Sequence, residues 1–149
     1  MNKKALIFIA LLLVSAGAQA QPQANFENVW LEHNVWENGV KGLRIHARFT
    51  VNNHLNANCL ITAHFYYANG QALKDFDGQY NDVNGYVSTN RNFVPAYASA
   101  RYDDLTLFMP YDQLHMDRGN TDLAFELGIY AEGRYLTKSN RVTFNYNKT

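Results

Sequence analysis

The segment 75–82 carries residue types that bind calcium. It supplies three carboxylates, Asp75, Asp77 and Asp82, together with an amide and free backbone carbonyls. Calcium takes about six to eight oxygen ligands, and a loop of this kind provides several of them. The spacing is not that of an EF-hand, because Gln79 stands where another ligand is required and no Glu closes the loop. Asp, Asn and Gly also form ordinary turns. The segment therefore predicts either a calcium site or a solvated turn.

Histidines suggest a second metal centre. If the stretches 43–51 and 59–67 pair as neighbouring strands, His46 and His64 stand opposite each other at their polar positions. Zinc is bound by imidazole nitrogens, and His33 or His115 would supply a third ligand. Histidines on the surface are also common without a metal. The histidines therefore predict either a zinc site or surface residues without a metal.

The residues that catalyse reactions in known enzyme classes are poorly arranged here. Cys59 and His64 are five positions apart, so one strand would point them to opposite faces and leave the thiol without a base. The sequence has no nucleophile elbow, HExxH pair, P-loop or dinucleotide fingerprint. The adjacent acids Asp103 and Asp104 are typical of a solvated strand end. The sequence predicts no enzyme, and a hydrolase of unknown substrate remains the alternative.

Tyrosine is abundant, with ten residues in the chain. Amphipathic rings on a rigid scaffold stack on sugars or anchor a protein partner at low entropic cost. The alternative is that these rings cover sheet edges and their own core. The candidate binding residues are Tyr66, Tyr80, Tyr86, Tyr97 and Tyr111.

Strict alternation marks the strands that must position these groups. Every odd residue from Leu43 to Val51 is apolar and every even residue is polar, which predicts a strand with one core face and one wet face. The stretch 59–67 alternates less clearly, because Leu60 and Tyr66 share the even positions with Thr62 and His64. Such a strand is either covered on both faces or has an exposed apolar face that can bind a partner.

Further strands are predicted between turn signals. The Asn69-Gly70 pair predicts a two-residue hairpin, and 110–115 predicts a helical turn. Residues 75–85 are expected to form a loop and 90–100 an irregular crossing. The remaining predicted strands are 26–36, 71–74, 86–88, 102–109, 123–130 and 135–146.

Seven or eight short strands without a long amphipathic helix predict an all-β, antiparallel β-sandwich of the Ig-like or C2-like kind, with a small closed barrel as the alternative. Arg44, His46 and Arg48 are expected to face water. The core is expected to contain Ile45, Phe49, Leu107, Phe125 and Ile129.

The N-terminus has the order of a secretory signal peptide. Two lysines precede an apolar run, and Ala18-Gln19-Ala20 matches a peptidase site, so residues 1–20 are expected to be removed and 21–149 to form one domain. The apolar run 5–14 is about half of the ~20 residues that span a bilayer. We therefore expect export to the periplasm or the extracellular space, without a transmembrane segment.

Charge and cysteine content limit the partners. Residues 21–149 contain 11 basic and 13 acidic residues with no basic run, which disfavours nucleic acid as a partner. Cys59 is the single cysteine, so no disulfide forms within one chain. Its apolar neighbours predict a buried, inert thiol.

The chain resembles an uncharacterised family of exported bacterial β-sandwich domains. The resemblance rests on residues 29–34, 41–46, 49–53, 68–70, 73–75, 108–111 and 114–115, among them the stretches Lys41-Gly42-Leu43-Arg44-Ile45-His46 and Phe108-Met109-Pro110-Tyr111. It implies the fold and export, and it implies no catalytic or binding residue. The expected function is a non-catalytic binding or accessory module for a protein or carbohydrate partner, with a protease inhibitor as one specific form. No cofactor is expected, and a calcium ion at Asp75, Asp77 and Asp82 is the alternative.

Overall fold

The computed structural model describes residues 23–149 as two antiparallel sheets packed face to face. One sheet has the strand order β1-β2-β5, and the other has the order β4-β3-β6 with β7 and β8 on the far edge of β6. The predicted signal peptide lies outside the described residues. The elements are β1 (Ala24–Glu37), β2 (Val40–Asn52), β3 (Cys59–Tyr67), β4 (Ser88–Phe93), β5 (Ser99–Pro110), the 3-10 helix η1 (Tyr111–Leu114), β6 (Gly119–Ala131), β7 (Arg134–Lys138) and β8 (Val142–Lys148).

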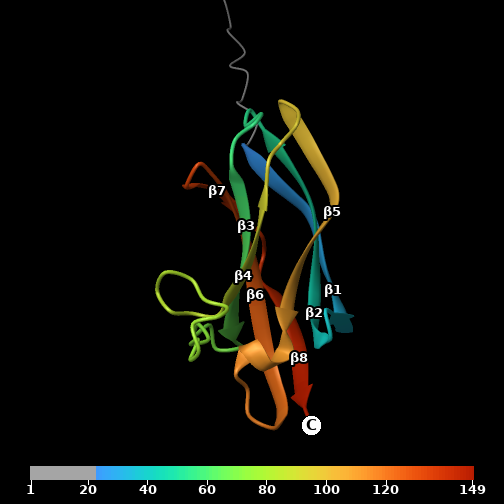
Figure 1. The fold of residues 1–149 in the computed structure, drawn as a ribbon, viewed down its shortest axis with the longest axis vertical. Helices are drawn as coiled ribbons and strands as arrows, with labels where there is room; N and C mark the ends of the chain where they lie inside the picture. Colours follow the sequence, from blue (N-terminus) through green and yellow to red (C-terminus); the bar gives the residue numbers. More distant parts are fainter. Residues whose placement is uncertain (1–22) are drawn as a thin grey trace, which may run out of the picture.

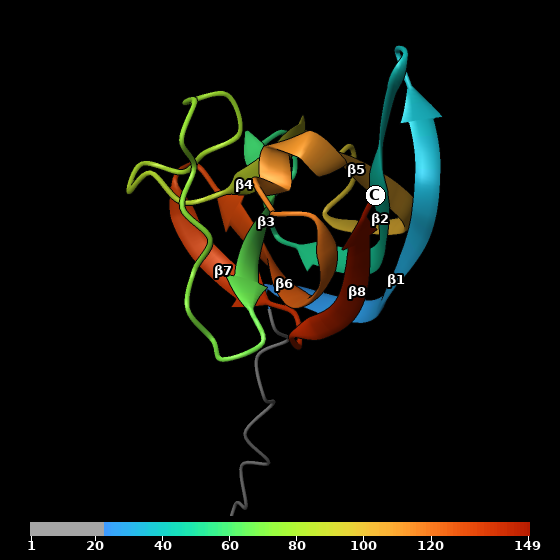
Figure 2. The ribbon, with the colours of Figure 1, turned by 90° about the horizontal axis from the view of Figure 1, so that it is seen from below.

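The two sheets do not close into a barrel, so the predicted β-sandwich is confirmed. Figure 2 shows the sheets facing each other, with β1 and β2 on one side and the loop before β4 on the outside of the other. No helix among residues 23–149 is long and apolar enough to cross a membrane.

The core lies between the sheets, where alternating side chains of both meet. Ile45 and Phe49 of β2 are fully buried, as are Phe125 and Ile129 of β6, and Leu107 of β5 joins the same cluster. The predicted core is therefore confirmed. Arg44, His46 and Arg48 of β2 turn outward as expected, and their side chains, which form ion pairs there, are 28%, 12% and 41% exposed.

Three strand predictions are wrong in detail. Residues 71–74 form only isolated bridges, because the chain leaves the sheet edge for the 75–87 loop. The predicted strand 135–146 is two strands on one edge of β6, interrupted where the buried Ser139 accepts a hydrogen bond from the Leu127 N–H. The predicted crossing 90–100 contains the end of β4 and the start of β5, so only residues 94–98 are irregular.

The turn after β3 is also different from its prediction. Gly70 has a φ of 89°, but Asn69 is not in the left-handed region. The Gly70 N–H donates to the Tyr67 carbonyl at 2.9 Å, and the Tyr67 N–H donates to the Gln71 carbonyl at 2.8 Å. These bonds define a three-residue loop ending in a left-handed glycine instead of a two-residue turn. The Asn69 side chain accepts a bond from the Gln71 N–H, which favours this form.

Gly42 gives a direct test of how closely β2 and β5 approach. A Cβ atom at this position would lie 2.3 Å from the Met109 carbonyl oxygen and 2.6 Å from the Phe108 ring. Gly42→Ala is therefore expected to lower the free energy of unfolding by about 1–3 kcal/mol, since overpacking forces the strands apart. Urea denaturation measures this, with the exposed neighbour Lys41→Ala as control. Equal stability of both variants would contradict the predicted contact.

Candidate functional site

A groove lies on the outer face of the five-stranded sheet. Strand register builds its floor, because residues paired across neighbouring strands point to the same side. Leu60 of β3 is paired with Asn92 of β4 and Tyr130 of β6. Thr62 is likewise paired with Asn90 and Gly128. Two adjacent rows of the sheet therefore present one aromatic ring, two amides and a hydroxyl to the outside.

The loop 75–87 forms one wall of this outer groove. Figure 1 shows the loop on the side of the five-stranded sheet that faces away from the other sheet. Asp82 and Val83 line the groove from the loop, and Val83 is fully exposed. The turn at Glu132 and Gly133 lines the groove as well. The groove has a volume of about 770 Å³.

The outer groove contains two exposed amides and one buried hydroxyl without a partner among the described residues. Thr62 is 8% exposed, and its hydroxyl is buried with no hydrogen-bond partner among the described residues. Asn90 and Asn92 are exposed. The Gly128 position has no side chain, and this leaves room for the Tyr130 ring, which lies 3.2 Å from where a Cβ would stand. The outer groove thus combines a ring, amides and an unpaired hydroxyl.

The wall of the outer groove is held by a histidine and a carboxylate. His64 Nδ1 lies 3.4 Å from Asp82 Oδ2. Asp82 Oδ1 also accepts the N–H groups of Asn84 at 2.8 Å and Tyr86 at 3.0 Å. Asp82 therefore closes its own turn and contacts β3. These contacts fix the position of the loop relative to the floor.

The five candidate tyrosines do not gather on one surface. Tyr66 is next to His64 on the outer face, but the Arg141 guanidinium covers its ring at 4.1 Å. Burial raises the pKa of Tyr66, and the Glu126 carboxylate adds to this. Tyr80 packs against the core, and Tyr86 lies in the loop, where it bridges to Lys74. Tyr97 is 72% exposed in the segment between β4 and β5.

Tyr111 stabilises the fold through packing and hydrogen bonds. Its ring is 7% exposed and stacks on Tyr146 with 4.6 Å between ring centroids. Its hydroxyl accepts the Asn34 N–H at 2.9 Å and contacts His33 Nδ1 at 3.2 Å. Burial raises the pKa of Tyr111. The ring therefore joins β1, η1 and β8 and presents little surface to a partner.

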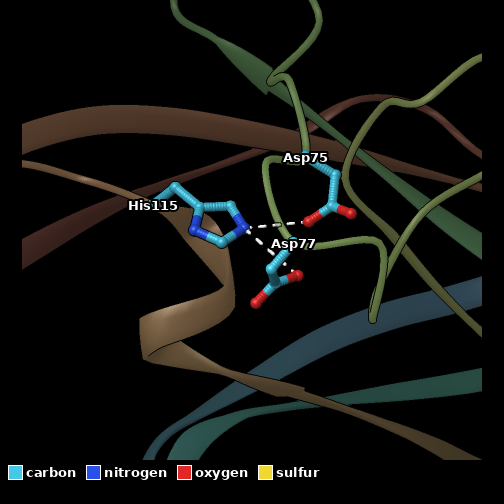
Figure 3. A group of neighbouring side chains, drawn as sticks. All are labelled: Asp75, Asp77 and His115. Carbon is cyan, nitrogen blue, oxygen red and sulfur yellow. Dashed lines mark hydrogen bonds and ion pairs between the residues drawn. The ribbon is translucent and has the colours of Figure 1, made fainter.

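The calcium candidates divide between two places. Asp75 and Asp77 lie beside His115, whereas Asp82 makes the separate contacts described above. His115 Nε2 is 2.8 Å from Asp75 Oδ1 and 3.9 Å from Asp77 Oδ1 (Figure 3). Asp75, Asp77 and His115 are named the DDH cluster below. His115 follows η1, so the cluster joins the loop to the segment after β5.

Hydrogen bonds favour the ionised form of Asp77 in the DDH cluster. The Gln79 N–H and then the Gln113 amide lower the pKa of Asp77 below its ordinary value, and the positive charge of His115 contributes less. Asp75 has a side chain that is only 1% exposed, and its Oδ2 accepts the Gly78 N–H at 2.7 Å. The cluster is thus partly enclosed and negatively charged.

The predicted opposition of His46 and His64 is wrong. Their strands lie in different sheets, since β2 pairs with β1 and β5 while β3 pairs with β4 and β6. His46 instead lies 2.7 Å from Asp104 and 3.1 Å from Glu32. The predicted separation of Cys59 and His64 is confirmed, because Cys59 is buried and His64 faces outward. Burial raises the pKa of the Cys59 thiol.

Sequence reasoning missed Tyr130, Asn90 and Asn92. A partial signal was present in β3, whose even residues Leu60, Thr62, His64 and Tyr66 predict a second covered or adhesive face. The pairing of β3 with β4 and β6 was needed to identify the neighbours.

Comparison of the chain with known protein families, with curated proteins and with solved structures finds no match.

Proposed function

We propose that this protein is an exported, non-catalytic module that binds an oligosaccharide in the outer groove. The proposal rests on the floor of the groove, where Tyr130, Thr62 and the two asparagines face the same side. A sugar ring has an apolar face that stacks on an aromatic ring and hydroxyls that bond to amides. The floor offers both kinds of contact at neighbouring positions.

The size and shape of the groove favour a carbohydrate over a folded protein. Small-molecule sites have volumes of about 300–1,000 Å³, and the groove falls in that range. A stable protein interface covers about 800 Å² on each partner, which is more than a small-molecule site offers. The floor also places an unpaired hydroxyl and two amides beside its ring, which suits the hydroxyls of a sugar.

Export and the lack of catalysis complete the proposal. The order of charged, apolar and small residues in 1–20 supports export to the periplasm or beyond. Cys59 packs in the core and is 2% exposed, and the raised pKa of its thiol disfavours a nucleophilic thiolate. We place no reacting group in the groove and assign it a binding role.

A glycan array followed by NMR titration tests this function. The chain from Gln21 is expected to bind at least one oligosaccharide on the array. Titration of that sugar into ¹⁵N-labelled protein should then shift the amide resonances of Leu60, Thr62, Asn90 and Asn92. Shifts confined to the outer face of β1, β2 and β5 would contradict the proposed groove. Capture of a protein partner in place of any sugar would contradict the ligand class.

A further inference from the structure

The DDH cluster has the donor set and placement of a metal site, and it is separate from the floor of the outer groove. Asp75 and Asp77 come from the loop, and His115 comes from the end of η1 (Figure 3). Leu73 before the aspartates is 1% exposed, and Leu114 before the histidine is fully buried. These anchored neighbours hold the three side chains in place before any ion arrives.

Both carboxylates approach the same nitrogen. The distances from His115 Nε2 are 2.8 Å to Asp75 Oδ1 and 3.9 Å to Asp77 Oδ1. Two ligands of a tetrahedral zinc ion, each about 2.0–2.1 Å from the metal, lie roughly 3.3 Å apart. The measured distances fall on either side of this value, so small side-chain movements would place an ion between the three atoms.

His46 shows that a histidine with two carboxylates need not form such a site. Asp104 contacts its Nδ1 at 2.7 Å, and Glu32 contacts its Nε2 at 3.1 Å. The two carboxylates therefore lie at opposite nitrogens of the ring, and one ion cannot contact all three groups. In the DDH cluster they share one nitrogen, which is the difference that matters for coordination.

A second observation at the DDH cluster is an unpaired amide oxygen. Gln113 donates through Nε2 to Asp77 Oδ2 at 3.0 Å. Its Oε1 is buried and has no hydrogen-bond partner among the residues that the structure describes. A buried amide oxygen normally has a partner, because its desolvation is otherwise uncompensated. Rotation of this amide by half a turn would exchange its nitrogen and oxygen, and a cation bound in the cluster would then be a partner for the oxygen.

We propose that Asp75, Asp77 and His115 bind one divalent transition-metal ion, with zinc as the representative ion. The imidazole nitrogen favours a transition metal over calcium, since calcium prefers oxygen ligands alone whereas zinc accepts nitrogen and carboxylate oxygen together. The ion would replace a proton at His115 Nε2 and neutralise both carboxylates. It would also tie the loop that forms the groove wall to η1.

Titration calorimetry with zinc chloride tests the site on the untagged chain from Gln21. One ion per chain is expected, and the melting temperature should rise by about 10 °C at a hundredfold excess of zinc over the dissociation constant. His115→Ala and Asp77→Asn should each weaken zinc binding by at least about tenfold. His46→Ala is the matched control and should bind zinc like the unchanged protein.

Cobalt and calcium separate coordination from nonspecific binding. Cobalt should compete with zinc and give visible absorption bands in the unchanged protein and in His46→Ala, and these bands should be lost in Asp77→Asn. Urea denaturation without metal verifies that each variant is folded. Equal zinc affinity of folded Asp77→Asn and the unchanged protein would overturn the site. A larger thermal shift with calcium than with zinc would overturn the metal class.

Discussion

Phe125→Ala is expected to lower the free energy of unfolding by about 3–5 kcal/mol, because it leaves a cavity at the centre of the sandwich. Phe125 is fully buried on β6, and its ring centroid lies 6.0 Å from that of Phe65 and 6.2 Å from that of Phe144. A domain of this size is stable by only about 5–15 kcal/mol. Urea denaturation followed by tryptophan fluorescence measures the loss.

Arg48→Ala is the control for the assignment of the sheet faces. The Arg48 side chain is 41% exposed, lies over Trp30 at 5.8 Å and is 4.0 Å from Asp103. Exposed ion pairs contribute little, so its removal should cost under about 1 kcal/mol. A greater loss from Arg48→Ala than from Phe125→Ala would mean that the faces of the sandwich are assigned backwards.

Tyr130→Ala is expected to have the largest effect on oligosaccharide binding. Its ring is the aromatic surface of the groove floor, beside Leu60 and edge-on to Tyr135 at 5.9 Å. Stacking on an aromatic ring at the centre of a site contributes about 1–3 kcal/mol, so the dissociation constant should rise roughly tenfold to a hundredfold. Titration calorimetry with the sugar identified on the array gives this ratio.

Tyr97→Ala is the matched control for the ring at Tyr130. Both side chains are tyrosines, but Tyr97 is exposed between β4 and β5 and does not line the groove. Its removal should leave the dissociation constant unchanged within about twofold. An effect of Tyr97→Ala as large as that of Tyr130→Ala would move the binding surface to the end of the sandwich.

The sequence predicted those parts of the fold that depend on alternation. β2 alternates strictly between apolar and polar residues, so its core face, including Ile45 and Phe49, follows from a period of two. The order of strands within the sheets depends on contacts between distant segments, which alternation does not encode. The predicted pairing of β2 with β3 placed His64 opposite His46 as a zinc ligand. The two strands lie in different sheets, so these histidines do not meet.

The candidate sites illustrate the same limit. Asp75 and Asp77 were identified because they are close in sequence, but His115 is brought to them by the path of the chain through β5 and η1. The abundance of tyrosine made Tyr111 a candidate binding residue, but its ring is buried and stacks on Tyr146. The groove residue Tyr130 is equally ordinary in sequence, and only its pairing with Leu60 places it on the floor.

Thr62→Val separates the role of the outer groove in binding from its contribution to stability. The Thr62 hydroxyl is buried and unpaired among the described residues, so valine of nearly the same shape should leave stability unchanged or raise it by up to about 1 kcal/mol. If the hydroxyl serves an oligosaccharide, the same change should weaken sugar binding by about tenfold. Unchanged sugar affinity together with a clear loss of stability would contradict a binding role for the outer groove.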